Sequence, residues 1–250
     1  MIKLPKLLFS LFLSFLLFSG TALAYGINIT IYDNNGYQAA GQGGEDDETE
    51  PGMINNQSWD LEAFFINSST LSMVGGFDFV KGNGIYNHGD IFIDVTGDAV
   101  YGVADAGGYE NYGYDFVIDL NMSALTYDVF KLDSNAVLLN AALDANQDWS
   151  NPWRYDGGSG ERIEFGSIIY DTGLSDSDVG LLGGSHNVVT GIDLGFIEDA
   201  GYSLDSFLVH STLECGNDNL IGSVPEPSNM FLLGTGLIGL ATIGRRRYFK

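Results

Sequence analysis

The middle of the chain alternates apolar and polar residues over short stretches that end at glycine, asparagine or aspartate. A period of two is typical of half-buried β-strands, and no stretch keeps the 3.6-residue period of a long amphipathic helix. We therefore expect strands at 27–31, 59–66, 70–74, 91–95, 114–120, 125–132, 162–170, 187–194 and 206–213. This pattern predicts an all-β domain, a single antiparallel β-sandwich or jelly roll.

Two pairs of these strands are separated by short polar turns and should form hairpins. Residues 67–69 join the second strand to the third, and residues 121–124 join the fifth to the sixth. The second strand is expected to bury one face, which carries Trp59, Leu61, Ala63 and Phe65. The stretch 136–143 is rich in alanine and leucine, so a short helix and a strand both remain open there.

The first residues of the chain have the pattern of a signal peptide. Lys3 and Lys6 precede an apolar run over 7–18, and Ala22-Leu23-Ala24 supplies the small residues that a signal peptidase reads. A first transmembrane helix is the alternative, but a run of 12 residues is short for one. We expect residues 1–24 to be a signal peptide, removed by signal peptidase between Ala24 and Tyr25 after use of the secretion machinery.

The last residues combine a proline motif, an apolar run and a basic cluster. Val224-Pro225-Glu226-Pro227-Ser228 is followed by the uncharged residues 229–244 and then by Arg245-Arg246-Arg247. Prolines preset an extended backbone that an enzyme's groove can hold, and arginines stay on the cytoplasmic side of a membrane. As a helix, residues 230–244 reach about 22 Å, less than the ~30 Å hydrocarbon core. This short length favours a membrane segment that is held only until the chain is cut, rather than a permanent anchor.

This tail resembles the PEP-CTERM sorting signal of bacterial surface proteins that are processed by exosortase, a membrane transpeptidase-like enzyme. Pro225-Glu226-Pro227 matches the motif itself. The run 210–218, His-Ser-Thr-Leu-Glu-Cys-Gly-Asn-Asp, and the stretch 86–98 are similar to segments of such ectodomains, in which the first of these runs ends the last strand. Ser211 and Leu213 depart from that pattern. The resemblance implies a sorting signal with a transmembrane helix at 223–250, and exosortase as partner. It also implies passage through the inner membrane to the cell surface or the extracellular matrix of a biofilm.

Composition sets the middle of the chain apart from its ends. Residues 25–222, 198 in number, suffice for one domain. They include 32 acidic and four basic residues, which gives a formal charge of −28, whereas the whole chain carries −23. Such a charge repels nucleic acid and anionic lipid and attracts cations, so nucleic acid is excluded as a partner. Cys215 is the only cysteine, which excludes an internal disulfide, and we expect it to be buried and inert.

Catalytic patterns are sparse. His88, His186 and His210 stand in no metal-binding spacing, and we expect each to be a hydrogen-bonding residue in a loop or at a strand end. The serines between glycines, Ser159 and Ser185, lack the context of a nucleophile elbow. An acid-rich chain offers too many carboxylate pairs for any to point to glycoside hydrolysis. No catalytic residue is assigned, and we expect a protein that is not an enzyme.

Calcium is the one cofactor that the residue pattern suggests. Candidate ligands with oxygen-bearing side chains are Asp144, Asn146, Asp148, Asp171, Asp176 and Asp178. The first three occupy alternate positions, as in the opening of an EF-hand loop, but Trp149 replaces its glycine and no glutamate closes the frame. Residues 90–98 form a further acidic cluster. The pattern is not that of an EF-hand and leaves calcium binding open.

Two functions remain. The first is a non-enzymatic exported protein of the cell surface or of the extracellular polysaccharide matrix. The alternative is a calcium-dependent, lectin-like module that binds carbohydrate. In that case Trp149, Trp153 and Tyr155 should be exposed in loops and stack on sugar rings.

Overall fold

The computed structural model describes residues 25–33, 57–100, 111–141, 151–158, 160–216 and 218–224, with the side chains of 32 and 33 left out. Within these ranges the chain forms antiparallel strands, two short helices and one 3-10 turn, η1 (Gln57–Trp59). The expected all-β, antiparallel class is confirmed. No helix within them is long and apolar enough to cross a membrane. The expected signal peptide and the tail from Pro225 onward lie outside the described residues.

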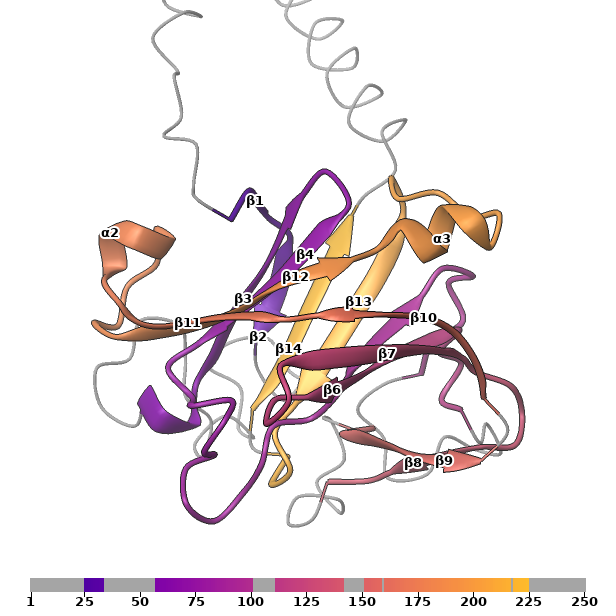
Figure 1. Ribbon diagram of the computed structural model, residues 1–250, viewed down its shortest axis with the longest axis horizontal. Coiled ribbons are helices and arrows are strands. Elements are labelled where there is room, and N and C mark those ends of the chain that lie inside the picture. Colours follow the sequence, from indigo (N-terminus) through magenta and orange to yellow (C-terminus); the bar gives the residue numbers. More distant parts are fainter. Residues whose placement is uncertain are drawn as a thin grey trace, which may run out of the picture.

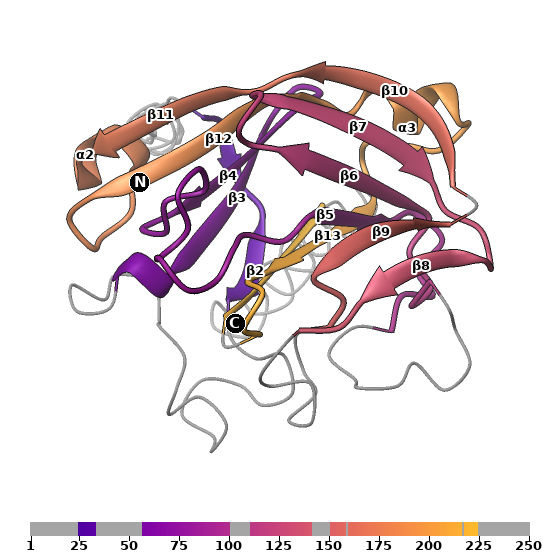
Figure 2. The same ribbon diagram turned by 60° about the horizontal axis from the view of Figure 1, so that its bottom comes forward.

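The strands form two large sheets and one small one (Figure 1). The five-stranded sheet has the order β1 (Ile27–Asn28), β3 (Leu61–Asn67), β4 (Thr70–Gly75), β12 (His186–Asp193) and β11 (Ile169–Leu174). The seven-stranded sheet has the order β10 (Glu161–Ser167), β7 (Thr126–Lys131), β6 (Phe116–Asn121), β5 (Ile91–Asp94), β13 (Phe207–Thr212), β14 (Asn219–Val224) and β2 (Thr30–Asp33). The small sheet pairs β8 (Ala136–Leu139) with β9 (Arg154–Gly158) and lies beside β6 and β7 (Figure 2).

The two large sheets share one buried cluster of apolar side chains. Phe64 and Met73 enter it from the five-stranded sheet, and Ile93, Phe116 and Val209 enter it from the seven-stranded sheet. All five side chains are fully buried. Burying each such side chain contributes roughly 1.5–3 kcal/mol relative to leaving it in water, so this cluster holds the sheets together.

The large sheets are also joined by strands that pass from one to the other. The single strand expected at 27–31 is divided, because β1 pairs with β3 and β2 pairs with β14. Between them Ile29 donates its N–H to the Phe64 carbonyl at 2.9 Å and accepts the Ser223 N–H at 2.8 Å. In the same way, the strand expected at 162–170 is divided at buried Ile168 into β10 and β11. Such corners let one chain segment serve both sheets.

Several strand predictions are refined by the structure. The β3–β4 and β6–β7 hairpins form as expected. Burial of a single face of β3 was wrong: a bulge near Leu61 places Leu61 and Phe64 in the central cluster. Ala63 and Phe65 pack on the other side, where Val179 of α2 (Asp176–Val179) covers them.

The last described part of the chain differs from the prediction. The 210–218 run does not end the last strand, because β14 follows it and lies between β13 and β2. Residues 210–212 of the run instead end β13, and in the connection to β14 the Leu213 N–H donates to the Asp218 carbonyl at 3.4 Å. Cys215 is buried in this turn, as expected. The stretch 136–143, left open between helix and strand, begins with β8, while 142–143 lie outside the described residues.

Candidate functional site

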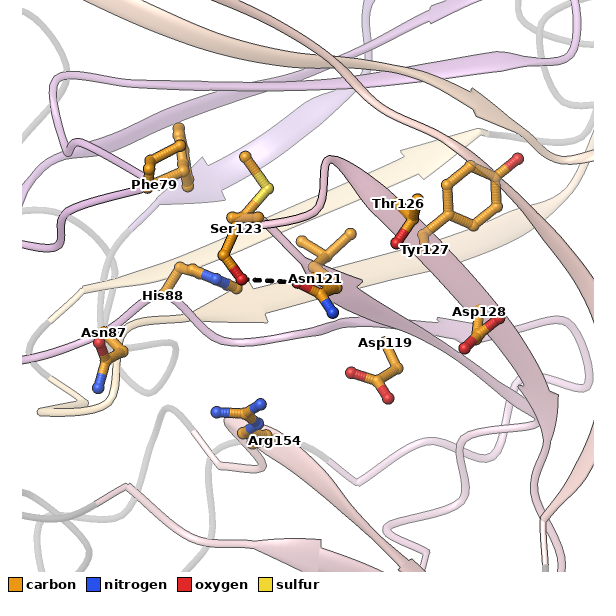
Figure 3. A pocket seen from close by; sticks show the side chains of 13 residues that line it. Phe79, Asn87, His88, Asp119, Asn121, Ser123, Thr126, Tyr127, Asp128 and Arg154 are labelled. Carbon is orange, nitrogen blue, oxygen red and sulfur yellow. Dashed lines mark hydrogen bonds between the residues drawn. The ribbon is translucent and has the colours of Figure 1, made fainter.

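A polar groove runs past β6, β7, β9 and the turn before β5 (Figure 3). It consists of two cavities of about 440 and 700 Å³, and both are lined by Asn87, Asp119 and Arg154. Because they share these residues, the two cavities are neighbours, and we call them together the Asp119–Arg154 groove. Volumes of this size are typical of ligand sites.

The two charged residues that give the groove its name project from strands whose neighbouring residues are buried. Asp119 stands in β6 between Ile118 and Leu120, which both belong to the central cluster. Arg154 begins β9 between Trp153 and Tyr155, each only 8 % exposed. Successive side chains of a strand point to opposite faces, so burial of the neighbours turns these two outward. Both project into the same space in Figure 3.

A buried carboxyl group, that of Asp90, connects the strands that carry Asp119 and Arg154. Asp90, only 1 % exposed, accepts the N–H of Leu120 at 3.1 Å through Oδ1 and the N–H of Tyr155 at 2.8 Å through Oδ2. Its own N–H donates to the Trp153 carbonyl at 2.8 Å. Burial raises the pKa of Asp90 to about 7, and the nearby charge of Asp119 adds to this rise. Asp90 therefore fixes the spacing between the two sides of the groove.

Among the described residues, neither the Asp119 carboxyl nor the Arg154 guanidinium forms an ion pair. Burial raises the pKa of Asp119, and Arg154 partly offsets this rise. Arg154 lies 5.8 Å from the centre of the Trp153 ring, a cation–π contact. Asp128, directly opposite Asp119 in the β6–β7 register, is bonded at 2.5 Å to Arg162. The groove is thus lined by one cation, Arg154, and by the carboxyl groups of Asp119, Asp128, Asp156 and Glu214, and Asp119 and Arg154 do not pair with each other.

The remaining polar groups of the groove offer both donors and acceptors. His88 Nδ1 donates to the Gly89 carbonyl at 2.8 Å, which leaves Nε2 as an acceptor. Burial, with Arg154 nearby, lowers the pKa of His88 and keeps it neutral. Asn121 accepts the Ser123 hydroxyl at 2.9 Å through Oδ1, so its amide N–H groups remain to donate. Such a mixed lining suits a ligand rich in hydroxyl groups.

The seven-stranded sheet also leads directly into the predicted sorting tail. Val224 is the last residue of β14 and pairs with Phe207, and Pro225 follows it in the chain. A family model described as PEP-CTERM protein-sorting motif matches residues 223–247. The chain carries a PEP-CTERM motif. This finding confirms the resemblance seen in the sequence and implies exosortase as the processing partner, with export through the membrane to the cell surface. No curated protein and no solved structure matched the chain.

The PEP-CTERM motif overlaps the fold only at its first residues. Ser223 and Val224 are half-buried in β14, whereas Pro225, Glu226, Pro227, Ser228 and the arginines 245–247 lie outside the described residues. At the other end, Tyr25 begins the described chain, and its hydroxyl donates to Asp171 at 3.1 Å. The predicted cleavage partner Ala24 lies outside the described residues.

Three aromatic residues were expected to be exposed for sugar binding, and this prediction was wrong for two of them. Trp153 and Tyr155 are buried rather than exposed. Their loop is in part the strand β9, so its alternation turns both inward and leaves Arg154 outward. Tyr155 packs against Phe130 with ring centres 4.9 Å apart. Trp149 lies outside the described residues.

Asp171, Asp176 and Asp178, the second group of expected calcium ligands, accept hydrogen bonds from other groups of the protein. Asp178 accepts the N–H and the hydroxyl of Ser175 at 2.8 and 2.6 Å and so caps α2, and these bonds lower its pKa. Asp176 accepts the Gly184 N–H at 2.7 Å. In the part of the chain that the structure describes, no group of three or more His, Cys, Asp or Glu residues is placed to hold a metal ion. Asp144, Asn146 and Asp148 lie outside that part.

The histidines take three different places. His88 lies in a loop and His186 begins β12, and both are hydrogen-bonded, as expected. His210 differs, because it lies inside β13, where it is fully buried and stacks on Tyr114 with ring centres 5.6 Å apart.

Sequence reasoning missed the role of His186. Its Nδ1 lies 2.6 Å from Glu62 Oε2, and its Nε2 lies 3.1 Å from Asp176 Oδ1. The His186 and Glu62 side chains are fully buried. This chain of contacts fastens α2 to β3 and β12. No spacing in the sequence signals it, because Glu62 lies 124 positions before His186.

Proposed function

We propose that this protein is a non-enzymatic, exported component of the cell surface or of the extracellular polysaccharide matrix, built as an antiparallel β-sandwich. The observation that carries the proposal is the PEP-CTERM motif at residues 223–247. Its first two residues, Ser223 and Val224, belong to β14, so the sorting motif begins within the folded, acidic β-domain. The chain passes through the inner membrane as an intermediate and loses residues 1–24 to signal peptidase and its tail to exosortase.

The experiment compares the wild-type chain with a variant in which Pro225, Glu226 and Pro227 are all replaced by alanine. We expect the wild-type protein outside the cell to lack residues 245–250 by intact mass, and the variant to stay in the inner membrane. A matched control, Lys131→Gln, alters an exposed residue of β7 and should be sorted like the wild type. Export of the triple variant at the wild-type level, or full-length chains ending at Lys250 outside the cell, would contradict the proposal.

Carbohydrate binding is the second candidate function, and the Asp119–Arg154 groove favours it. The groove is polar and lined by groups that donate and groups that accept hydrogen bonds. The calcium-dependent form of this candidate depends on Asp144, Asn146 and Asp148, because Asp176 and Asp178 already accept hydrogen bonds within the fold. A glycan pull-down in calcium and in chelator tests it: retention that chelator abolishes supports the calcium-dependent form, and equal retention contradicts it.

A further inference from the structure

The Asp119–Arg154 groove places an arginine without an ion pair in a domain that is overwhelmingly acidic. Of the four basic residues of the domain, Lys81 bonds Asp78 at 3.0 Å and Arg162 bonds Asp128 at 2.5 Å. Arg154 forms no ion pair among the described residues, although Asp119 lines the same cavities. The two groups are therefore more than the 4 Å of an ion pair apart, with space between them, and a ligand can contact both.

The fold holds this space at a fixed width. Asp90 bonds the backbone on the β6 side at Leu120 and on the β9 side at Tyr155. The flanking residues Leu120, Trp153 and Tyr155 are buried, so the backbone beneath both charged groups is anchored. Groups held in this way lose little freedom when a ligand binds, and this raises affinity.

The chemistry of the lining selects the ligand. Arg154 can only donate hydrogen bonds and the Asp119 carboxylate can only accept them, while Asn121 adds donors and His88 an acceptor. Neighbouring sugar hydroxyls donate and accept at short spacing, so they satisfy both kinds of group. Two neighbouring cavities of about 440 and 700 Å³ leave room for more than one sugar unit. The formal charge of −28 on residues 25–222 repels anionic chains, which leaves neutral ones.

We propose that the Asp119–Arg154 groove binds a segment of neutral polysaccharide, whose hydroxyl groups donate to Asp119 and accept from Arg154. This deepens the carbohydrate-binding candidate and rests on the proposed location in a polysaccharide matrix. It differs from the calcium-dependent form because protein side chains alone make the contacts. Trp153 and Tyr155 border the larger cavity but are each only 8 % exposed, so they offer little ring surface for stacking and serve mainly to position Arg154.

The test measures binding of the full chain in detergent, where no processing step is needed. The probes are the neutral and the anionic fractions of the host's own extracellular polysaccharide, titrated by calorimetry with and without chelator. We expect the neutral fraction to bind equally well in both conditions. Asp119→Asn and Arg154→Gln should each weaken binding roughly 10- to 100-fold, because each removes a hydrogen bond to a charged group.

Matched controls are Asp205→Asn and Lys131→Gln, which likewise replace a charged side chain by an amide at exposed positions outside the groove. They should bind like the wild type, and all four variants should melt within a few degrees of it, which separates lost binding from lost folding. Absence of binding to the neutral fraction, preference for the anionic fraction, loss of binding in chelator, or unchanged binding by both groove variants would each overturn the proposal. None of these outcomes bears on sorting, which the triple alanine variant tests by itself.

Discussion

Glu62 and His186 are separated by 124 positions in the chain, yet their side chains meet at 2.6 Å with neither exposed to solvent. Gln57 donates to the second oxygen of Glu62 at 2.7 Å, and Asp176 contacts the second nitrogen of His186. A buried pair of this kind stabilises little in itself, but loss of one partner leaves the other buried without compensation. The contact is thus a sensitive point of the five-stranded sheet.

We predict that Glu62→Ala lowers the free energy of unfolding by about 1–3 kcal/mol, because it leaves the buried His186 without this hydrogen-bond partner. Urea denaturation followed by circular dichroism measures the loss. Glu161→Ala removes an exposed glutamate of β10 and should change stability by about 0.5 kcal/mol or less. The double variant of Glu62→Ala and His186→Ala should cost less than the sum of the single ones. Strict additivity would show that the pair does not act as a unit.

Asp90 should make stability fall as pH rises. In the folded chain the Asp90 carboxyl has a pKa of about 7, whereas in the unfolded chain it releases its proton near pH 3.8. The contribution of this group is therefore complete below about pH 4 and is lost as pH rises through 7, at no more than about 1.4 kcal/mol per pH unit. Thermal melts from pH 4 to 8 should show that Asp90→Asn costs most stability at pH 4.

Asp178 provides the opposite control for the Asp90 experiment. Its pKa is lowered by the bonds from Ser175, so its contribution is present above its ordinary pKa and is lost as pH falls. The cost of Asp178→Asn should therefore grow from pH 3 to pH 5. A cost of Asp90→Asn that is the same at pH 4 and pH 8 would show that folding does not raise the pKa of Asp90.

The length of the folded domain can be tested at its C-terminal strand. Leu220 and Ile221 of β14 are fully buried, and each contributes roughly 1.5–3 kcal/mol. Their sum is a large share of the roughly 5–15 kcal/mol that stabilises a domain. We expect a chain of residues 25–224 to unfold cooperatively and a chain of residues 25–218 to be unfolded, as judged by near-ultraviolet circular dichroism. A cooperative melt of the shorter chain at the same temperature would show that β14 is dispensable.

Cations should stabilise the acidic domain in two distinguishable ways. Sodium chloride relieves self-repulsion by screening, since the Debye length is about 8 Å at 0.15 M salt. At matched ionic strength we expect calcium to raise the melting temperature further and to saturate, as binding to the folded state requires. Replacing Asp144 and Asp148 by asparagine should remove the extra increment, while Asp171→Asn should keep it. If calcium, magnesium and sodium curves coincide, the acids form a solvated surface only.

The sequence predicted most strands but not how they divide between the sheets. Alternation over 27–31 is the same whether Ile29 lies inside one strand or at a corner, because local periodicity carries no information about the partner strand. Contacts with Phe64 and Ser223 decide that question. The turn-rich segment around Trp153 looked like a loop for a similar reason. Pairing with β8 makes it the strand β9 and buries the two aromatic rings expected to be exposed.

The sequence by itself determined the all-β class and the sorting tail, because period-two alternation and the order of motif, apolar run and arginines are local properties of the chain. It also determined the acidic character of the domain, which is a matter of composition. Only the tertiary structure decided that Asp119 and Arg154 line one groove, that Asp90 fixes their spacing, and that His186 lies against Glu62. Each of these relationships joins residues from different strands, and the packing of the sheets is what brings those strands together.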